Sequence, residues 1–152
     1  MLATLGAAGT GGAQGAQGRV VREWHVGLTA ALAQRDFWGA ELGLGVRPGR
    51  AGAGQTRFAV AVAAGDAEGT AGVRVAGSAQ FVLRPAARAG ASPYAGLGLA
   101  FAGARGVSGG GYLAALLGVE AAPGTQRGWF VELGVGGGVR AVAGVRWRRL
   151  PS

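Results

Sequence analysis

Residues 38–46 read Trp-Gly-Ala-Glu-Leu-Gly-Leu-Gly-Val, and residues 129–136 read Trp-Phe-Val-Glu-Leu-Gly-Val-Gly. In the first stretch every second residue from Trp38 to Val46 is apolar, and the positions between them hold Gly or Glu41. Successive side chains of a β-strand point to opposite faces, so this period of two indicates a strand whose faces differ. One face carries large apolar side chains, and the other carries minute ones with an occasional charge.

The same alternation recurs in eight segments, which are separated by short connectors rich in Gly, Pro, Asp and Ser. These residues favour turns because Gly allows positive φ and Pro fixes φ. Connectors this short leave no room for a crossover helix, so neighbouring strands should be antiparallel and follow in chain order. The predicted strands are 20–32, 37–47, 56–64, 70–84, 93–104, 111–121, 127–136 and 139–149. The predicted fold class is all-β, an eight-stranded antiparallel up-and-down meander that closes into a transmembrane-type β-barrel and leaves no unpaired edge.

The high glycine content agrees with a small barrel. Gly makes up 33 of the 152 residues, and each Gly inside a helix costs about 1 kcal/mol relative to Ala, which argues against a helical bundle. In strands, Gly suits positions that face a narrow space, such as the lumen of an eight-stranded barrel. No stretch approaches the roughly 18 unbroken apolar residues of a membrane helix.

The charge distribution argues against nucleic acid as a partner. All 15 basic residues are Arg, and the net charge is +8. These residues are scattered at turns and strand ends, with no basic helix and no exposed aromatic platform of the kind that binds single strands. Such a distribution fits anionic lipid headgroups better.

The two strand faces indicate which side of the barrel meets lipid. In a membrane barrel the large apolar side chains point outward. The opposite face holds charges of both signs in similar number, which can pair inside a narrow lumen. The predicted outward residues are Trp24, Val26, Leu28, Ala30, Leu32, Phe58, Val60, Val62, Val73, Val75, Ala79, Phe81, Leu83, Leu97, Leu99, Phe101, Leu113, Leu117, Val119, Val131, Leu133, Val135, Val139, Val145 and Trp147. The predicted lumen residues are Glu23, His25, Glu41, Arg57, Arg74, Gln80, Glu120, Glu132, Arg140 and Arg146.

The four Trp residues support an outward apolar face. Trp24, Trp38, Trp129 and Trp147 lie near predicted strand ends on that face. Membrane barrels place aromatic girdles at both interfaces, because the ring is apolar and its N–H needs a wet partner. In an up-and-down barrel, three of the four should share one rim on the adjacent first, seventh and eighth strands. In a soluble barrel the same residues would be ordinary core residues.

Residues 20–149 resemble the small eight-stranded outer-membrane β-barrel proteins of Gram-negative bacteria, including the Arg- and Gly-rich barrels common in GC-rich genomes. The resemblance implies contact with outer-membrane lipid and lipopolysaccharide, and insertion by the barrel-assembly machinery, which reads a last strand of alternating hydrophobics ending in an aromatic. The residues that match this signal are Val139, Ala141, Ala143, Val145 and Trp147. Two departures stand out: residues 148–152 follow the aromatic, and the longer connectors follow the second and fourth strands.

The chain divides into two parts by composition. Residues 1–18 are predicted to be a flexible leader or a truncated signal-peptide remnant, and residues 19–152 the barrel domain. Leu2 to Ala8 is a short apolar stub, and residues 11–13 offer small side chains for cleavage, although the basic start of a signal is missing.

Candidate chemistry is sparse. The single His25 shares a strand face with Glu23, which could orient its ring in a dyad, as in a lipid A-modifying barrel enzyme. The deacylase pattern of His and Ser two apart is missing, because position 27 is Gly. One His and no Cys leave only carboxylates for a metal. The Gly-rich stretches 43–45 and 136–140 lack the context and the Lys of phosphate loops. We therefore expect no catalytic residues, no cofactor and no metal.

The predicted function is that of a monomeric, non-enzymatic outer-membrane barrel with a packed, charge-paired lumen and a structural or surface-interaction role. Two alternatives stay open. One is a soluble or periplasmic barrel that binds a small apolar ligand, with the faces exchanged and a cavity lined by Leu42, Leu97, Leu117 and Leu133. The other is the lipid A-modifying enzyme that uses His25.

Overall fold

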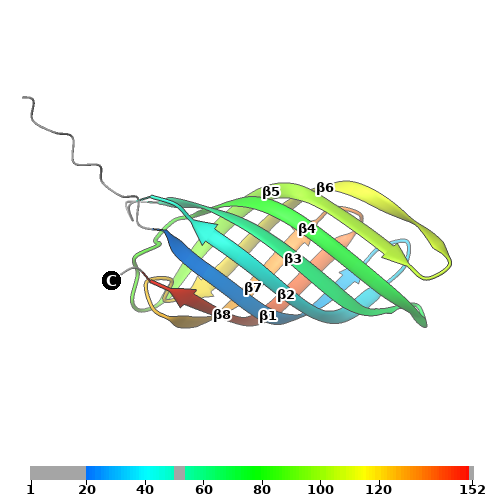
Figure 1. Ribbon diagram of the computed structural model, residues 1–152, viewed down its shortest axis with the longest axis horizontal. Helices are drawn as coiled ribbons and strands as arrows, with labels where there is room; N and C mark the ends of the chain where they lie inside the picture. The colour runs from blue at the N-terminus through cyan, green and yellow to red at the C-terminus, as the bar shows by residue number, and fades with distance from the viewer. Residues whose placement is uncertain (1–19, 50–53, 151–152) are drawn as a thin grey trace, which may run out of the picture.

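Eight antiparallel strands close into one barrel in chain order (Figure 1). The computed structural model describes residues 20–49 and 54–150, so the predicted leader at 1–18 lies outside the described residues. The first and last strands close the barrel, pairing Arg22 with Arg149 at one end and Leu32 with Val139 at the other. The strands are β1 (Val21–Leu32), β2 (Phe37–Arg47), β3 (Gln55–Ala67), β4 (Thr70–Val82), β5 (Ala91–Ala104), β6 (Val107–Ala121), β7 (Arg127–Val135) and β8 (Val139–Arg149). The predicted fold class is confirmed.

Two connectors are shorter than the sequence predicted. β3 continues to Ala67 and meets β4 through the two-residue turn Glu68-Gly69, whose φ angles are 50° and 80°. β6 begins at Val107, directly after the turn Arg105-Gly106. Two-residue hairpins keep the strands paired up to the turn, so the polar and Gly residues that suggested loops remain in the ladder.

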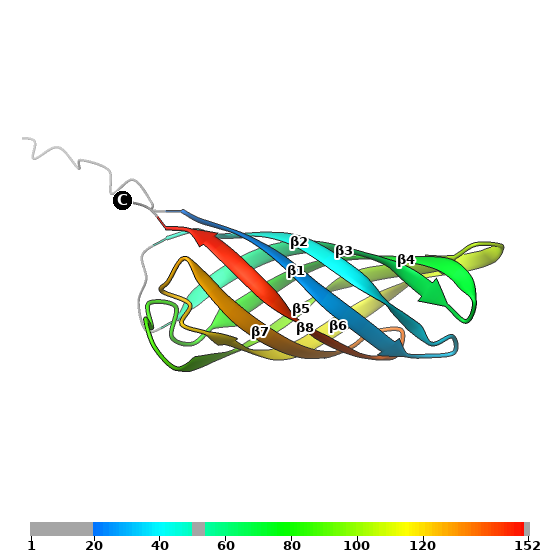
Figure 2. The same ribbon diagram turned by 90° about the horizontal axis from the view of Figure 1, so that it is seen from below.

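The two ends of the barrel differ (Figures 1 and 2). We call the end that carries Val21 and Arg149 the terminal end, and the opposite end the mouth. The longer connectors, after β2 and β4, lie at the terminal end. The mouth carries the four connectors 33–36, 68–69, 105–106 and 136–138. The β5–β6 hairpin reaches furthest beyond the mouth.

The strand faces point as predicted. The large outward side chains are exposed, from 37% at Val119 to 82% at Leu113. Val145 and Trp147 are half-buried at the closing pair of strands. All ten predicted lumen residues are buried. The alternative with exchanged faces is wrong, because its four cavity-lining Leu residues are 57–70% exposed on the outside.

Glycines on the inner face make room for large lumen side chains. Gly43 pairs with His25, and a Cβ at Gly43 would lie 2.1 Å from the imidazole. Gly118 pairs with Tyr94, and a Cβ there would lie 2.2 Å from the phenol ring. The small residues of the inner face therefore leave space for a large side chain of the neighbouring strand to lie over them. The described part of the chain contains no helix long and apolar enough to cross a membrane.

Candidate functional site

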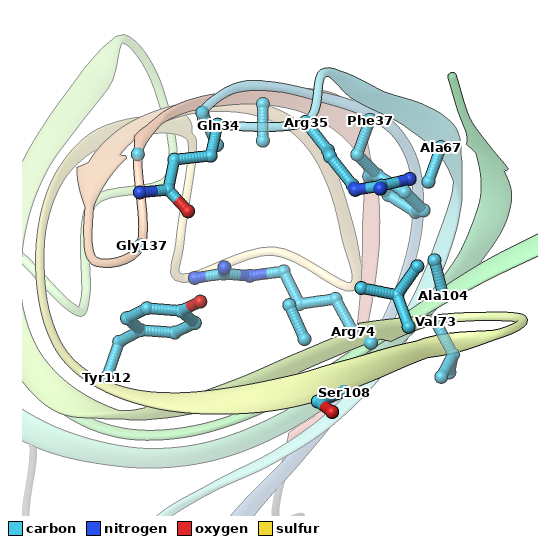
Figure 3. Close-up of a pocket in the computed structure, with 16 residues that line it drawn as sticks. Gln34, Arg35, Phe37, Ala67, Val73, Arg74, Ala104, Ser108, Tyr112 and Gly137 are labelled. Atoms are coloured by element: carbon cyan, nitrogen blue, oxygen red, sulfur yellow. The ribbon is translucent and has the colours of Figure 1, made fainter.

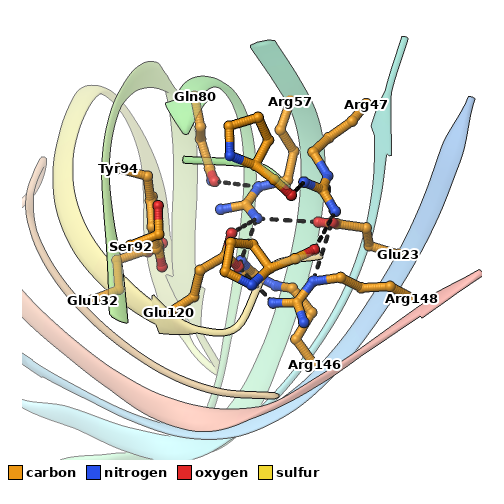
Figure 4. Close-up of polar contacts among 12 residues, drawn as sticks. Glu23, Arg47, Arg57, Gln80, Ser92, Tyr94, Glu120, Glu132, Arg146 and Arg148 are labelled. Carbon is orange, nitrogen blue, oxygen red and sulfur yellow. Dashed lines mark hydrogen bonds and ion pairs between the residues drawn. The ribbon is translucent and has the colours of Figure 1, made fainter. Parts of the chain in front are cut away.

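The lumen holds two clusters of charged side chains. The first, the terminal cluster, stands on the parts of the strands near the terminal end of the barrel, and Figure 4 shows its contacts. Its members come from strands all around the wall: Glu23, Arg47, Arg57, Gln80, Glu120, Arg146 and Arg148. Each of these side chains is buried.

Glu120 is the hub of the terminal cluster. Its Oε2 accepts from Arg57 Nη1 at 2.9 Å, Arg146 Nη1 at 2.5 Å and Arg148 Nη2 at 2.8 Å. These donors stand on β3 and β8, so Arg57 spans the lumen to reach a carboxylate on β6. A fully buried carboxylate is tolerated only when its charge is paired and its oxygens accept hydrogen bonds, and here three guanidinium groups provide both.

Glu23 links the terminal cluster to the connectors at the same end. It pairs with Arg47 Nε at 2.7 Å and with Arg57 Nη1 at 3.1 Å. Arg47 also donates to the carbonyl oxygens of Pro85 at 3.2 Å and Pro123 at 3.0 Å. One guanidinium therefore ties the lumen to the β4–β5 and β6–β7 connectors and fills the terminal end.

Arg47 and Arg148 were missed in the sequence analysis. Both stand at strand ends. Each lies an even number of residues from a predicted lumen residue on the same strand, Glu41 on β2 and Arg146 on β8, and therefore faces inward as well. Extending the period of two to the last residue of each strand would have found them. With them, the described residues place six buried Arg and four buried Glu in the lumen, so Arg is in excess.

The second cluster, the central cluster, lies beside the terminal cluster in the lumen. Arg140 bridges two carboxylates, pairing with Glu41 and, at 2.7 Å, with Glu132. His25 Nε2 lies 3.3 Å from Glu41 Oε1, and the Tyr94 hydroxyl donates to Glu132 Oε2 at 3.2 Å. Both carboxylates are thus held from two sides.

The prediction that His25 forms a dyad with Glu23 is wrong. His25 contacts Glu41, while Glu23 is held by arginines of the terminal cluster. Spacing alone does not choose the partner, because residues two apart on one strand are roughly 6–7 Å apart and a diagonal neighbour across the ladder, at about 7–8 Å, is also within reach of a long side chain. Glu41 is that diagonal neighbour, because the residue opposite His25 is Gly43.

The surroundings of His25 are closely packed. Its ring meets Phe130 edge-on at 5.0 Å, and the adjoining space measures about 40 Å³. Ser78 lines the same space, but its hydroxyl accepts a hydrogen bond from Gln80. Such a space holds a water or two, and it is far too small for an acyl chain. Within the described ranges, no three His, Asp or Glu residues gather as a metal site.

A larger cavity, of about 650 Å³, opens at the mouth (Figure 3). It is lined by connector residues and by the mouth-side ends of the strands. Arg74 stands between this cavity and the small space beside His25, and lines both.

A closed eight-stranded meander with an apolar exterior and an ionic lumen has the fold of the small outer-membrane β-barrels. Solved structures bear this out. The N-terminal β-barrel domain of Pseudomonas aeruginosa OprF is similar with a TM-score of 0.62 and 17% identity, over 88% of this chain and 100% of that chain. Neisserial surface protein A is similar with a TM-score of 0.57 and 17% identity, over 84% of this chain and 96% of that chain.

The Yersinia pestis outer membrane protein Ail is also similar, with a TM-score of 0.55 and 15% identity, over 87% of this chain and 99% of that chain. At these identities the likeness shows the fold alone. No family model and no curated protein matches the chain.

Proposed function

We propose that this chain is an integral outer-membrane barrel with a packed, charge-paired lumen and a structural or surface-interaction role, without catalysis. The observation that carries the proposal is the apolar belt, which we define as the outward positions that lie at least two residues inside either end of a strand. Every such position holds an apolar residue or Gly on all eight strands. Soluble monomers rarely expose continuous apolar patches larger than a few hundred Å². A belt that encircles the whole barrel is stable in contact with lipid.

The rims of the belt suit a membrane interface. At the terminal end the outward charges that the strands carry are Arg22, Arg127 and Arg149. They adjoin Trp24 and Trp147, and the Arg127 guanidinium lies 5.6 Å from the centre of the Trp147 ring. Indole rings favour the headgroup region, and guanidinium groups attract anionic lipid. This arrangement supports outer-membrane lipid and lipopolysaccharide as the surroundings of the barrel.

The rest of the exterior supports a monomer. The belt continues across β1, β8 and every other strand without a polar break, so each strand can meet lipid. β8 carries the alternating hydrophobics and the aromatic Trp147 that the barrel-assembly machinery is expected to read. We infer insertion by that route.

The lumen supports a role other than a pore. Eight strands enclose a space that side chains can fill. The terminal cluster fills it at one end, where Arg47 also donates to the carbonyl oxygens of two connectors. The space left beside His25 is about 40 Å³.

Depth-dependent fluorescence quenching tests the membrane proposal. In a background with all four Trp changed to Phe, one variant restores Trp129 and another carries Val131→Trp, in the middle of the same outward face of β7. In vesicles of brominated lipid, we expect shallow bromines to quench Trp129 most and deep bromines to quench position 131 most. Phe130→Trp, which faces the lumen, is the matched control and should be quenched least. Equal quenching of all three, or no quenching at 131, would contradict lipid contact.

Two further measurements test the lumen and the absence of catalysis separately. In planar bilayers we expect no stepwise conductance, and regular channel openings would overturn the packed lumen. Lipid A incubated with the protein should keep its mass spectrum. A mass change that disappears in His25→Ala would establish the enzyme instead.

A further inference from the structure

The mouth cavity has an unusual set of lining groups. Its polar side chains are Gln34 and Arg35 from the β1–β2 connector, Arg74 from β4, and Ser108 and Tyr112 from β6 (Figure 3). None of the described residues that line this cavity is Asp or Glu. A cavity of about 650 Å³ with two guanidinium groups and no carboxylate is therefore cationic.

Arg74 is the group that most needs a partner. It is only 8% exposed. Its Nη1 donates to the carbonyl oxygen of Gly136 at 3.2 Å, while its Nε has no hydrogen-bond partner. The other five buried arginines each form an ion pair with a carboxylate, whereas Arg74 forms none among the described residues. A buried charge without a counter-charge is costly, and an anion that binds beside it removes much of that cost.

The carboxylates nearest to Arg74 in the lumen are already engaged. Glu41 and Glu132 line the small space on the lumen side of Arg74. Both pair with Arg140, and they also contact His25 and Tyr94 respectively. Neither carboxylate forms an ion pair with Arg74, so a group that binds directly to its guanidinium would reach it from the mouth side.

The mouth side can receive an organic molecule as well as a charge. In Figure 3, Arg35 and Arg74 reach into the cavity from different parts of its wall, and the Tyr112 hydroxyl points toward the Arg74 guanidinium. Phe37 and Ala67 supply apolar wall. Ligand sites commonly measure 300–1,000 Å³ and combine such walls with a few converging polar groups.

We propose that the mouth cavity binds a small, soluble organic anion, a carboxylate or a phosphate monoester. The anionic group accepts hydrogen bonds from Arg74, with Arg35 and Tyr112 on either side, and the apolar part lies against Phe37. The ligand is soluble and not lipid-borne, because Arg74 stands on the inner wall of the strand ring, whereas the belt is on the outer face. The proposal does not depend on the membrane role of the exterior.

Calorimetric titration of the full chain in phosphatidylcholine nanodiscs tests the site. The probes are phenyl phosphate and benzoate. Inorganic phosphate tests the anionic group without an apolar part, and benzyl alcohol tests the apolar part without a charge. We expect saturable binding of the first two, weaker binding of inorganic phosphate and none of benzyl alcohol. Lipopolysaccharide in the nanodisc should not displace phenyl phosphate. Displacement, or equal binding of benzyl alcohol, would overturn the proposal.

A matched pair of variants locates the anion. Arg74→Gln should weaken phenyl phosphate binding about tenfold or more, because charge-assisted hydrogen bonds are lost. Arg105→Gln removes the same charge from an exposed turn at the same end, outside the cavity, and should change binding less than about twofold. Equal weakening by both variants would show a general charge effect and contradict the site. Arg74 makes no ion pair with any described residue, so its replacement should leave the barrel folded, which circular dichroism checks.

A measurement on the unaltered protein keeps the proposal testable if the Arg74 variant does not fold. In ¹⁵N-arginine-labelled protein, phenyl phosphate should move the Nε–Hε resonance of one buried guanidinium, and benzyl alcohol should not. An unchanged set of buried Nε–Hε resonances at saturating phenyl phosphate would overturn the site.

Discussion

Trp24 and Trp147 stack across the seam where the first and last strands meet, with ring centroids 4.6 Å apart and ring planes 15° apart. They are register partners in the β1–β8 pair. The strands furthest apart in the chain are thus joined by an aromatic contact on the outer face, next to the ladder hydrogen bonds. Closure is the step that removes both sheet edges, so this contact acts where the fold is completed.

A double-mutant cycle of Trp24→Ala and Trp147→Ala should give a coupling free energy of about 0.5–1.5 kcal/mol, as for stacked aromatic pairs. The measurement is reversible urea unfolding in lipid vesicles. The control cycle combines Trp24→Ala with Trp38→Ala. Trp24 pairs with a residue near the terminal end of β2, whereas Trp38 lies at the mouth end of β2, so these two rings do not touch. Its coupling should be near zero. Equal couplings in the two cycles would contradict a specific contact at the seam.

Glu120→Gln should lower the free energy of unfolding by about 3–5 kcal/mol, the usual cost of breaking a buried ion pair from one side. The reason is that Arg57, Arg146 and Arg148 each lose an ion pair with the same buried carboxylate. Glu68→Gln makes the same chemical change at an exposed turn position and should alter stability by less than about 0.5 kcal/mol. If Glu120→Gln were as mild as its control, the terminal cluster would not hold the barrel together.

Gly43→Ala should destabilise the barrel by about 1–3 kcal/mol, because the new methyl group would displace the His25 ring. Gly45 is two residues along on the same face of β2, and there a Cβ would meet its nearest atom at 3.4 Å, an ordinary contact. Gly45→Ala should therefore be neutral or slightly stabilising. Unfolding curves of the two variants give the comparison, and equal losses of stability would refute the role given to Gly43.

Arg47→Ala should loosen the terminal end without breaking the barrel wall. The variant removes the donors to Pro85 and Pro123, so amide hydrogen exchange should speed up in the β4–β5 and β6–β7 connectors. Arg22→Ala, an exposed change at the same end, should leave that exchange unchanged. Faster exchange limited to β2 would show that Arg47 does not tie the connectors.

The alternation from Trp38 to Val46, repeated along the chain, was enough to predict eight strands, their order, and which residues face the lumen. A period of two fixes the face of every side chain once one face is known. The errors lay at strand ends: the turns at Glu68 and Arg105 are shorter than the polar stretches suggested, and two inward arginines were overlooked. Polar residues at the rim of a barrel occur both in turns and at strand ends, so composition alone could not show where each strand ends.

Which lumen groups meet was decided only by the closed barrel. Parity puts Arg57 and Glu120 inside, but their contact depends on the register of each strand pair between β3 and β6 and on a lumen narrow enough for a side chain to cross. The same geometry places His25 against Glu41 and leaves Arg74 without an ion pair among the described residues. Alternation is a local property of the backbone. Ion pairing across a lumen is set by distances between strands far apart in the chain, which exist only after closure.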